Sequence, residues 1–262
     1  MRIVFQALLV AGFLAGSPVC AQTAVADGKQ EPAKSCEVPP DLMPVGDSVL
    51  RTVAAAIKTR KKLDILIVGS GSSTLAGPDG ASIAYPARLE TSLREKLPGI
   101  AITVTTHLQP KKPAEEVAET LKGLVAERKP DLLLWQTGTF DAIRAVHPDD
   151  FRNALDDGVS SVKAGGADAM LMNLQYSPQM DAMIPTGPYL DNIRAVAQQQ
   201  DVPLFDRYAI MLSWSENGVF DLSNSSRSFA LAKAVHGCIG HALADFVIAA
   251  AKIDPVEFKA QR

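Results

Sequence analysis

The amino-acid sequence predicts a three-layer α/β/α protein built on a five-stranded parallel sheet. Five short runs of apolar residues, several of them rich in β-branched side chains, alternate with longer segments in which apolar residues recur at helical spacing. Parallel strands need crossover connections, and helical crossovers cover both faces of such a sheet. The sequence contains no repeat of about 20 to 50 residues, which excludes solenoids and propellers.

Length and charge narrow the class of protein. The chain has 262 residues, of which 47% are hydrophobic and 21% charged, a composition typical of an ordinary globular protein. Its 26 basic and 29 acidic residues give a formal net charge of -3. Such a chain has no basic field to attract nucleic acid or anionic lipid, so we expect no nucleic-acid partner.

The first 21 residues are predicted to be a cleaved secretory signal peptide. Arg2 precedes an apolar stretch over residues 3–15, and Val19-Cys20-Ala21 resembles a cleavage site. The apolar stretch is shorter than the roughly 20 residues of a membrane-spanning helix. Val19 also stands where a lipoprotein would have a small residue. The sequence therefore predicts a periplasmic or secreted protein without a stable membrane anchor.

The rest of the chain is divided into three parts. Residues 22–47 are rich in Ala, Lys, Glu and Pro and are predicted to form a flexible N-terminal extension. Residues 48–254 carry the alternating pattern of the α/β domain, and residues 255–262 form a C-terminal tail. The oligomeric state is left open.

The elements of the domain follow from hydrophobic periodicity. A first helix is expected over 48–59. Strands are expected over 63–68, 101–106, 131–135, 168–174 and 202–205. Helices are expected between and after them over 84–96, 113–128, 149–164, 188–200 and about 226–252.

Two cysteines remain after removal of the signal peptide. Cys36 and Cys238 lie near opposite ends of the mature chain, and an exported protein passes into a compartment that oxidises thiols. We predict a disulfide between them; the alternative is two unpaired thiols, with Cys238 a small buried residue. The sequence has no C-x-x-C motif, so no metal site is expected.

The sharpest functional signal is a glycine- and serine-rich loop. In an open parallel sheet, functional residues lie where the strands end, and the first strand ends in Gly69-Ser70-Gly71-Ser72-Ser73-Thr74. Glycines permit a sharp turn that presents a serine beside backbone N–H groups. A dinucleotide fingerprint is not completed, because Thr74 occupies its third position and no acidic residue ends the second strand. We expect no cofactor.

This loop resembles the nucleophile block of SGNH or GDSL-type hydrolases, in which a G-D-S-x-T-like stretch ends the first strand. The resemblance extends through "YPARLE" (85–90), "DLLLWQTGTFDA" (131–142), "LMNLQYSP" (171–178) and the C-terminal "HALADFV" helix. It implies a flavodoxin-like sheet with strand order 2-1-3-4-5. It also implies ester hydrolysis by a serine without metal or cofactor.

The resemblance allows two positions for the nucleophile. Matching Ser70-Gly71-Ser72 to Gly-Asp-Ser recovers the following Thr74 and makes Ser72 the nucleophile. Matching Gly71-Ser72-Ser73 recovers the glycine and makes Ser73 the nucleophile. We favour Ser72, with Ser73 among the substrate-binding residues.

The sequence departs from the family pattern at four positions. Neither serine follows an Asp, and the stretch after the second strand, 107–110, lacks the family's glycine. Phe140 replaces the asparagine of the third block, and Asn224 replaces the histidine of the closing Asp-x-x-His. Losing one preorganised oxyanion donor costs about 100- to 1000-fold in rate. Substitute donors at strand ends are expected among the following residues: Gln136, Thr139 and Gln175.

A serine nucleophile needs a base, and His236 is the favoured candidate with Asp221 as its orienting acid. His236 borders the buried stripe of the last helix, whereas His241 faces water. A helix unbroken from Ser226 would place His236 about 15 Å from its start, which opposes a direct Asp221 contact. His107 is the alternative base, and a packed histidine without catalytic role is the structural alternative for His236.

A literal G-D-S occurs at Gly46-Asp47-Ser48. It follows three prolines rather than a strand, so no sheet edge would present Ser48 as a nucleophile. We interpret Asp47 or Ser48 as the N-cap of the helix that follows.

Together these features predict an exported serine ester hydrolase, an esterase or deacylase, acting on a small acyl ester. The expected partner is a small-molecule or glycan ester, with envelope carbohydrate or lipid as its source. Two alternatives remain: a catalytically inactive binding module on the same fold, and an acyltransferase that uses the same serine.

Overall fold

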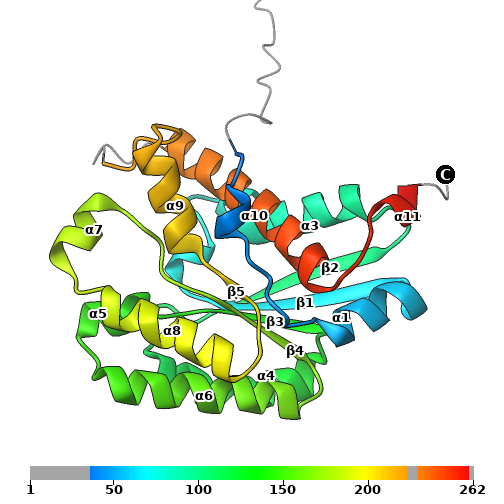
Figure 1. The fold of residues 1–262 in the computed structure, drawn as a ribbon, viewed down its shortest axis with the longest axis horizontal. Helices are drawn as coiled ribbons and strands as arrows, with labels where there is room; N and C mark the ends of the chain where they lie inside the picture. The colour runs from blue at the N-terminus through cyan, green and yellow to red at the C-terminus, as the bar shows by residue number, and fades with distance from the viewer. Residues whose placement is uncertain (1–35, 224–228, 260–262) are drawn as a thin grey trace, which may run out of the picture. The chain divides into compact units, whose positions relative to one another are not determined.

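The structure is a computed structural model that describes residues 36–223 and 229–259 (Figure 1). The predicted signal peptide and residues 22–35 of the predicted extension lie outside this range, as does Asn224.

The central sheet has five parallel strands in the order β2-β1-β3-β4-β5, which confirms the predicted fold class and strand order. The strands are β1 (Lys62–Gly69), β2 (Ala101–Leu108), β3 (Leu132–Gln136), β4 (Asp168–Met172) and β5 (Leu204–Phe205). In the described chain the longer helices are α3 (Tyr85–Lys96), α4 (Ala114–Arg128), α6 (Pro148–Ala164), α8 (Gly187–Gln199), α9 (Arg207–Glu216) and α10 (Phe229–Ala250). The shorter helical segments are η1 (Pro40–Leu42), α1 (Arg51–Ala55), η2 (Ala56–Arg60), η3 (Gly71–Ser73), α2 (Gly80–Ile83), α5 (Thr139–Arg144), α7 (Pro178–Met183) and α11 (Val256–Lys259).

The helices form two layers, one on each face of the sheet (Figure 1). Side chains alternate along a strand, so Leu63, Ile65 and Ile67 of β1 join the core under α3, α9 and α10. Leu66 and Val68 join the core under α4, α6 and α8. Both faces of β1 are therefore buried, as the continuous apolar run of this strand predicts.

Cys36 and Cys238 form a disulfide with Cα atoms 5.0 Å apart, which confirms the predicted bond. The segment that follows Cys36 packs on the α3 and α10 side of the sheet through Val38, Leu42 and neighbouring side chains. The indole N–H of Trp214 in α9 donates to the Glu37 carbonyl at 3.2 Å. The described part of the predicted extension is thus attached to the domain core.

Several predicted boundaries differ from the structure. The strand expected over 168–174 ends at Met172, because the next side chain, Asn173, bonds to groups around the start of α9. The strand expected over 202–205 is limited to Leu204–Phe205, since Pro203 has no backbone N–H for the ladder. A short helix, α11, lies within the predicted tail.

The helices directly after β3, β4 and β5, which are α5, α7 and α9, were not expected from the sequence. Two of them begin at signals that the sequence contains. Ser177 caps α7 ahead of Pro178, and Asp206 caps α9 by accepting from the Ala209 N–H at 3.0 Å.

Among the described helices, α10 is long and apolar enough to cross a membrane by length and composition. Its most apolar window is 56% buried within the protein, and it packs against α3. We interpret it as the core helix of this fold.

Candidate active site

The serine loop lies where β1 and β3 end side by side. The two strands are paired, with Val68 opposite Trp135. β1 passes into the 3-10 turn η3, and Ser70 caps this turn by accepting from the Ser72 N–H at 3.4 Å. β3 ends at Gln136, so the Gln136 side chain meets the serine loop.

Gly69 is required by the close packing of this turn. A Cβ atom at this position would lie 2.1 Å from Oγ and 3.0 Å from Cβ of Ser73. Any larger residue would displace Ser73, which is only 2% exposed. The first glycine of the loop therefore allows the turn to fold back over the strand end.

Gln136 is the centre of the polar network at the strand ends. Its Nε2 donates to Oγ of Ser70 at 2.9 Å and to Oγ of Ser72 at 2.8 Å. Its Oε1 accepts from Oγ of Ser73 at 2.6 Å and from the Tyr85 hydroxyl at 3.0 Å. A side-chain amide has two donors and two acceptor positions, so this buried residue has every hydrogen-bonding position filled.

This network distinguishes the three serines. Ser73 is buried and uses its hydroxyl proton in the bond to Gln136. Ser72 is half-buried, and its Oγ accepts from Gln136 while lying 3.3 Å from Oγ of Ser70. Gln136 therefore binds Ser72 through an oxygen lone pair and leaves the Ser72 proton for another acceptor.

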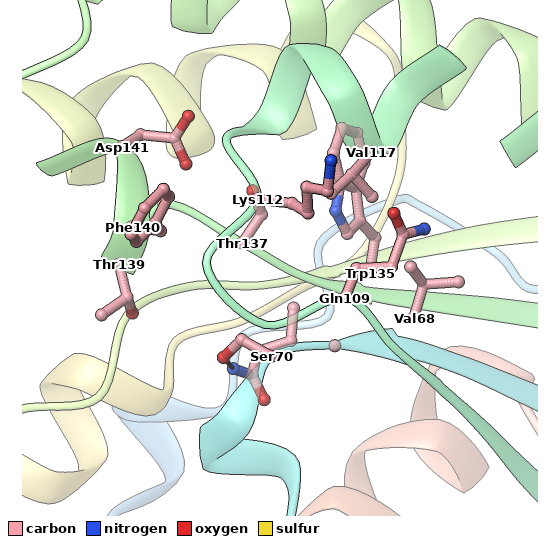
Figure 2. Close-up of a pocket in the computed structure, with 13 residues that line it drawn as sticks. Val68, Ser70, Gln109, Lys112, Val117, Trp135, Thr137, Thr139, Phe140 and Asp141 are labelled. Atoms are coloured by element: carbon pink, nitrogen blue, oxygen red, sulfur yellow. Dashed lines mark hydrogen bonds between the residues drawn. The ribbon is translucent and has the colours of Figure 1, made fainter. Parts of the chain in front are cut away.

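A small pocket adjoins the network (Figure 2). Ser70 lines one side of it, and Thr139, Phe140 and Asp141 from the start of α5 line another. Thr139 Oγ1 is buried and has no hydrogen-bond partner within the described residues. The Thr139 hydroxyl is thus able to donate to a group that enters the pocket. Phe140, at the family's asparagine position, offers no donor.

His236 on α10 contacts the start of α3. Its Nδ1 accepts from the Tyr85 N–H at 3.0 Å, and the two rings lie 5.9 Å apart. Burial, assisted by the positive charge of Arg207, lowers the pKa of His236 to about 4. The imidazole is therefore neutral at pH 7, and because Nδ1 accepts, its proton is on Nε2.

The other predicted site residues lie in three places. Asp221 is exposed, and its Oδ1 accepts from the N–H and hydroxyl of Ser223. Gln175 is half-buried in the loop between β4 and α7. His107 belongs to β2 itself and lies opposite Val68, whereas the sequence predicted it just beyond the strand.

The literal G-D-S lies away from this edge. Ser48 donates to Asp201, which follows α8 and precedes β5, at the amino ends of the strands. The helix that follows begins at Arg51 with Leu50 as its N-cap, so the predicted capping by Asp47 or Ser48 is wrong.

Comparison with protein families gives a match to the Non-GDSL lipase-like family over residues 35–253. The chain belongs to this family. The family name agrees with the absence of an Asp before either candidate serine. Comparison with curated proteins gave no match.

Solved structures share the fold of this Non-GDSL lipase-like protein. TesA is 20% identical with a TM-score of 0.56, covering 71% of this chain and 99% of its own. A catalytic mutant of Axe2, an acetylxylan esterase from Geobacillus stearothermophilus, is 16% identical with a TM-score of 0.57, covering 74% and 95%. The esterase EstA from Pseudoalteromonas sp. is 16% identical with a TM-score of 0.55, covering 72% and 97%. These likenesses support the SGNH hydrolase-like fold.

Two site residues of this family member escaped the sequence prediction. Ser70 shares the Gln136 amide with Ser72, and its position directly after the strand-ending Gly69 was the available signal. Tyr85, which lies 12 residues after Ser73 in the sequence, contacts both Ser73 and Gln136. Burial raises the pKa of its phenol, so it acts as a neutral donor. Its contact with Gln136 depends on how α3 packs, which no local pattern reports.

Proposed function

We propose that this Non-GDSL lipase-like protein is an exported serine ester hydrolase acting on a small acyl ester, with Ser72 as the nucleophile. The observation that carries the proposal is the Gln136 amide, which holds Ser72 Oγ at a strand end without using the serine proton. Relatives of the same fold include an acetylxylan esterase and the esterase EstA. They support an acyl ester, and an envelope carbohydrate or lipid is our proposed source of the acyl group.

In the proposed reaction, Ser72 Oγ attacks the acyl carbonyl carbon, and the alcohol leaves with the proton of the serine. Water then attacks the acyl-serine ester, and the carboxylic acid is released. Thr139 is proposed to donate to the carbonyl oxygen, since its hydroxyl has no partner among the described residues. Ser73, Gln136 and Gln175 are proposed to shape the substrate site, with Ser73 and Gln136 acting through the hydrogen bonds around Ser72.

His236 is the proposed base, and Asp221 its proposed orienting acid. For Nε2 to take the serine proton, the neutral imidazole must carry its proton on Nδ1. That tautomer loses the hydrogen bond from the Tyr85 N–H. The proposal therefore requires His236 to change its hydrogen bonding when substrate binds.

The same hydrogen bond favours a second function, a binding module that has lost catalysis. With Nδ1 engaged, neutral His236 offers a donor at Nε2 and no base. The absent family asparagine and glycine add to this argument, because both would supply oxyanion donors. In this case the pocket beside Ser70 binds its ligand without turnover.

Export is part of the proposal. A disulfide between residues 202 positions apart is typical of proteins in oxidising compartments. We propose a periplasmic or secreted location.

The deciding experiment measures covalent labelling by a fluorophosphonate, read by intact mass, beside turnover of p-nitrophenyl acetate and butyrate. We expect one label per wild-type molecule. Ser72→Ala is expected to remove the label and to lower turnover by about 1000-fold or more, because the nucleophile is lost. Ser70→Ala is the matched control, since Ser70 shares the same Gln136 donor and should keep the label.

Each other outcome has a distinct meaning. A label that persists in Ser72→Ala but disappears in Ser73→Ala transfers the role to Ser73. Neither label nor turnover in folded wild-type protein supports the binding module instead. Label without hydrolysis, with ester formed when an alcohol is added, identifies an acyltransferase.

A further inference from the structure

Arg207 is a buried arginine at the start of α9. It directly follows the helix cap Asp206, and only 3% of its surface is exposed. Because β5 leads into α9 at the carboxyl edge of the sheet, Arg207 lies on the same edge as the serine loop. Its positive charge is the second cause, after burial, of the lowered pKa of His236, and it opposes the rise that burial produces in the pKa of Tyr85. The guanidinium is therefore within electrostatic range of these two side chains.

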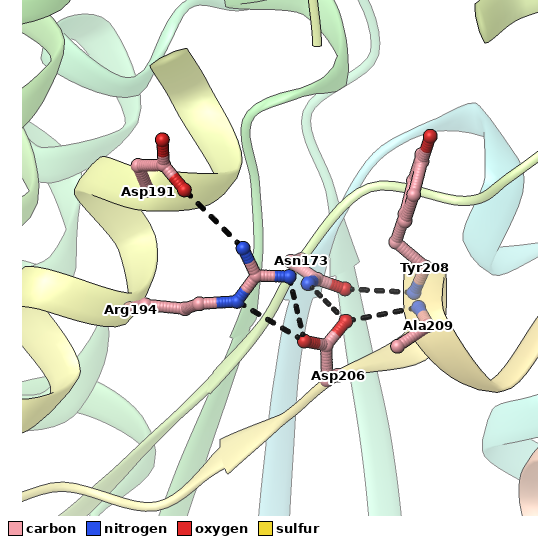
Figure 3. A network of polar contacts seen from close by, with 6 residues as sticks. All are labelled: Asn173, Asp191, Arg194, Asp206, Tyr208 and Ala209. Carbon is pink, nitrogen blue, oxygen red and sulfur yellow. Dashed lines mark hydrogen bonds and ion pairs between the residues drawn. The ribbon is translucent and has the colours of Figure 1, made fainter. Parts of the chain in front are cut away.

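One edge of this guanidinium has no hydrogen-bond partner. Within the described residues, Nε and Nη2 of Arg207 are buried and unpaired. These two nitrogens direct N–H bonds to the same side, which is an edge that binds carboxylates. Arg194 uses the same edge in this protein: its Nε and Nη2 lie 3.3 and 3.1 Å from Oδ2 of Asp206 (Figure 3).

The Arg207 guanidinium carries its positive charge at neutral pH. Burial lowers the pKa of Arg207 to about 10, which leaves the guanidinium protonated. Tyr85 supplies no negative charge, because burial raises the pKa of its phenol. The adjacent acid, Asp206, is already bonded to Arg194 and to the first turn of α9. A buried charged group with two unsatisfied nitrogens is costly, and a bound anion would offset that cost.

The backbone on both sides of Arg207 is held in place (Figure 3). The Asn173 side chain, which is fully buried, donates to Oδ1 of Asp206 at 2.7 Å and accepts from the Tyr208 N–H at 3.0 Å. These bonds fix the residues that flank Arg207, so its unpaired edge belongs to a rigid helix start. A fixed helix start reduces the conformational entropy that the Arg207 side chain loses when a ligand binds.

We propose that Arg207 is a binding site for the carboxylate of a small organic acid, which its Nε–H and Nη2–H hold side by side. The fork geometry favours a planar carboxylate over a spherical ion such as chloride. The 3% exposure of the residue limits the entering group to a small one. The proposal concerns binding, and its test does not require ester hydrolysis.

The test measures binding of ¹³C-formate and ¹³C-acetate to the mature chain by broadening of the ligand NMR signal, at an ionic strength held constant with chloride. We expect saturable broadening that unlabelled acetate reverses. Arg207→Lys keeps the charge but loses the fork and should weaken binding by about 10-fold or more. Arg128→Lys, at an exposed arginine, is the matched control and should bind like the wild type.

Arg207→Met provides a variant that removes the charge while filling the space. It is expected to fold, to lose formate binding, and to have a higher thermal midpoint than the wild type in chloride, because an unpaired buried charge is gone. A formate-soaked crystal of the wild type locates the anion without any variant.

Three results would overturn the proposal. The first is a formate NMR signal that wild-type protein broadens no more than Arg207→Met does, together with a soaked crystal in which only water lies beside Arg207. The second is formate binding that Arg207→Lys leaves unchanged. The third is displacement of formate by inorganic phosphate at a lower concentration than by acetate, which would assign the site to a tetrahedral oxyanion.

Discussion

A single residue, Gln136, organises the hydrogen bonds of the candidate site. The sequence predicts Gln136 at a strand end as a substrate-binding residue, and in the structure its amide bonds to three serines and Tyr85. Its residue type and position could be read from the sequence. Its four partners could not, because all of them lie outside β3: three in the serine loop and one at the start of α3.

His236 makes stability depend on pH. Its pKa is lowered from about 6.5 to about 4 by burial and by Arg207. Between these values the unfolded chain binds a proton that the folded chain does not, so the free energy of unfolding falls as pH drops from about 6.5 towards 4. We expect His236→Asn to remove this component, because its amide oxygen still accepts from the Tyr85 N–H but does not titrate.

Urea unfolding of both proteins between pH 4 and pH 8 measures this contribution. The free energy of unfolding of the wild type should fall more steeply on acidification than that of His236→Asn. Parallel curves would mean that His236 has the same pKa in the folded and unfolded states.

At the scale of elements, α9 shows how a strand end positions a helix. Its cap Asp206 is bonded by Asn173 from the end of β4 and by Arg194 from α8. The helix start therefore depends on two other elements. This explains why the sequence pattern identified α3, α4 and α6, which have long apolar stripes, and missed α9.

Loss of this cap is expected to destabilise the whole domain. Asp206→Ala should lower the free energy of unfolding by about 1 to 2 kcal/mol, since it removes the helix cap and leaves Asn173 without its acceptor. Asp206→Asn keeps an acceptor and should cost less. Asp191→Ala removes only an exposed ion pair with Arg194 and should change stability by less than about 0.5 kcal/mol. Urea denaturation compares the three; equal losses in all three would contradict the capping role.

For the whole molecule, the Cys36–Cys238 disulfide joins segments that are 202 residues apart in sequence. The chain-entropy model gives about 5 kcal/mol for a loop of this length, and typical measured values are about 2 to 4 kcal/mol. We expect the double variant Cys36→Ser, Cys238→Ser to lose stability in this range.

Chemical unfolding of oxidised wild type, reduced wild type and the double variant measures the effect. The reduced wild type and the double variant should have the same free energy of unfolding, because both lack the disulfide. Peptide mapping without reductant provides the control, and a map without a Cys36–Cys238 linked peptide would contradict the prediction.

The sequence by itself determined the fold class, the strand order, the serine loop and the pairing of the two cysteines. The fold class follows from local periodicity and the need for helical crossovers. The serine loop follows from the glycines after the first strand, and the cysteine pairing from counting cysteines. The strand order is what the resemblance to SGNH hydrolases implies. Only the tertiary structure decided which groups surround the serines: Tyr85 from α3, His236 from α10 and the unpaired Arg207 from α9. The physical reason is that apolar periodicity records which face of a helix is buried. It does not record which polar side chains from separate helices meet where those buried faces end.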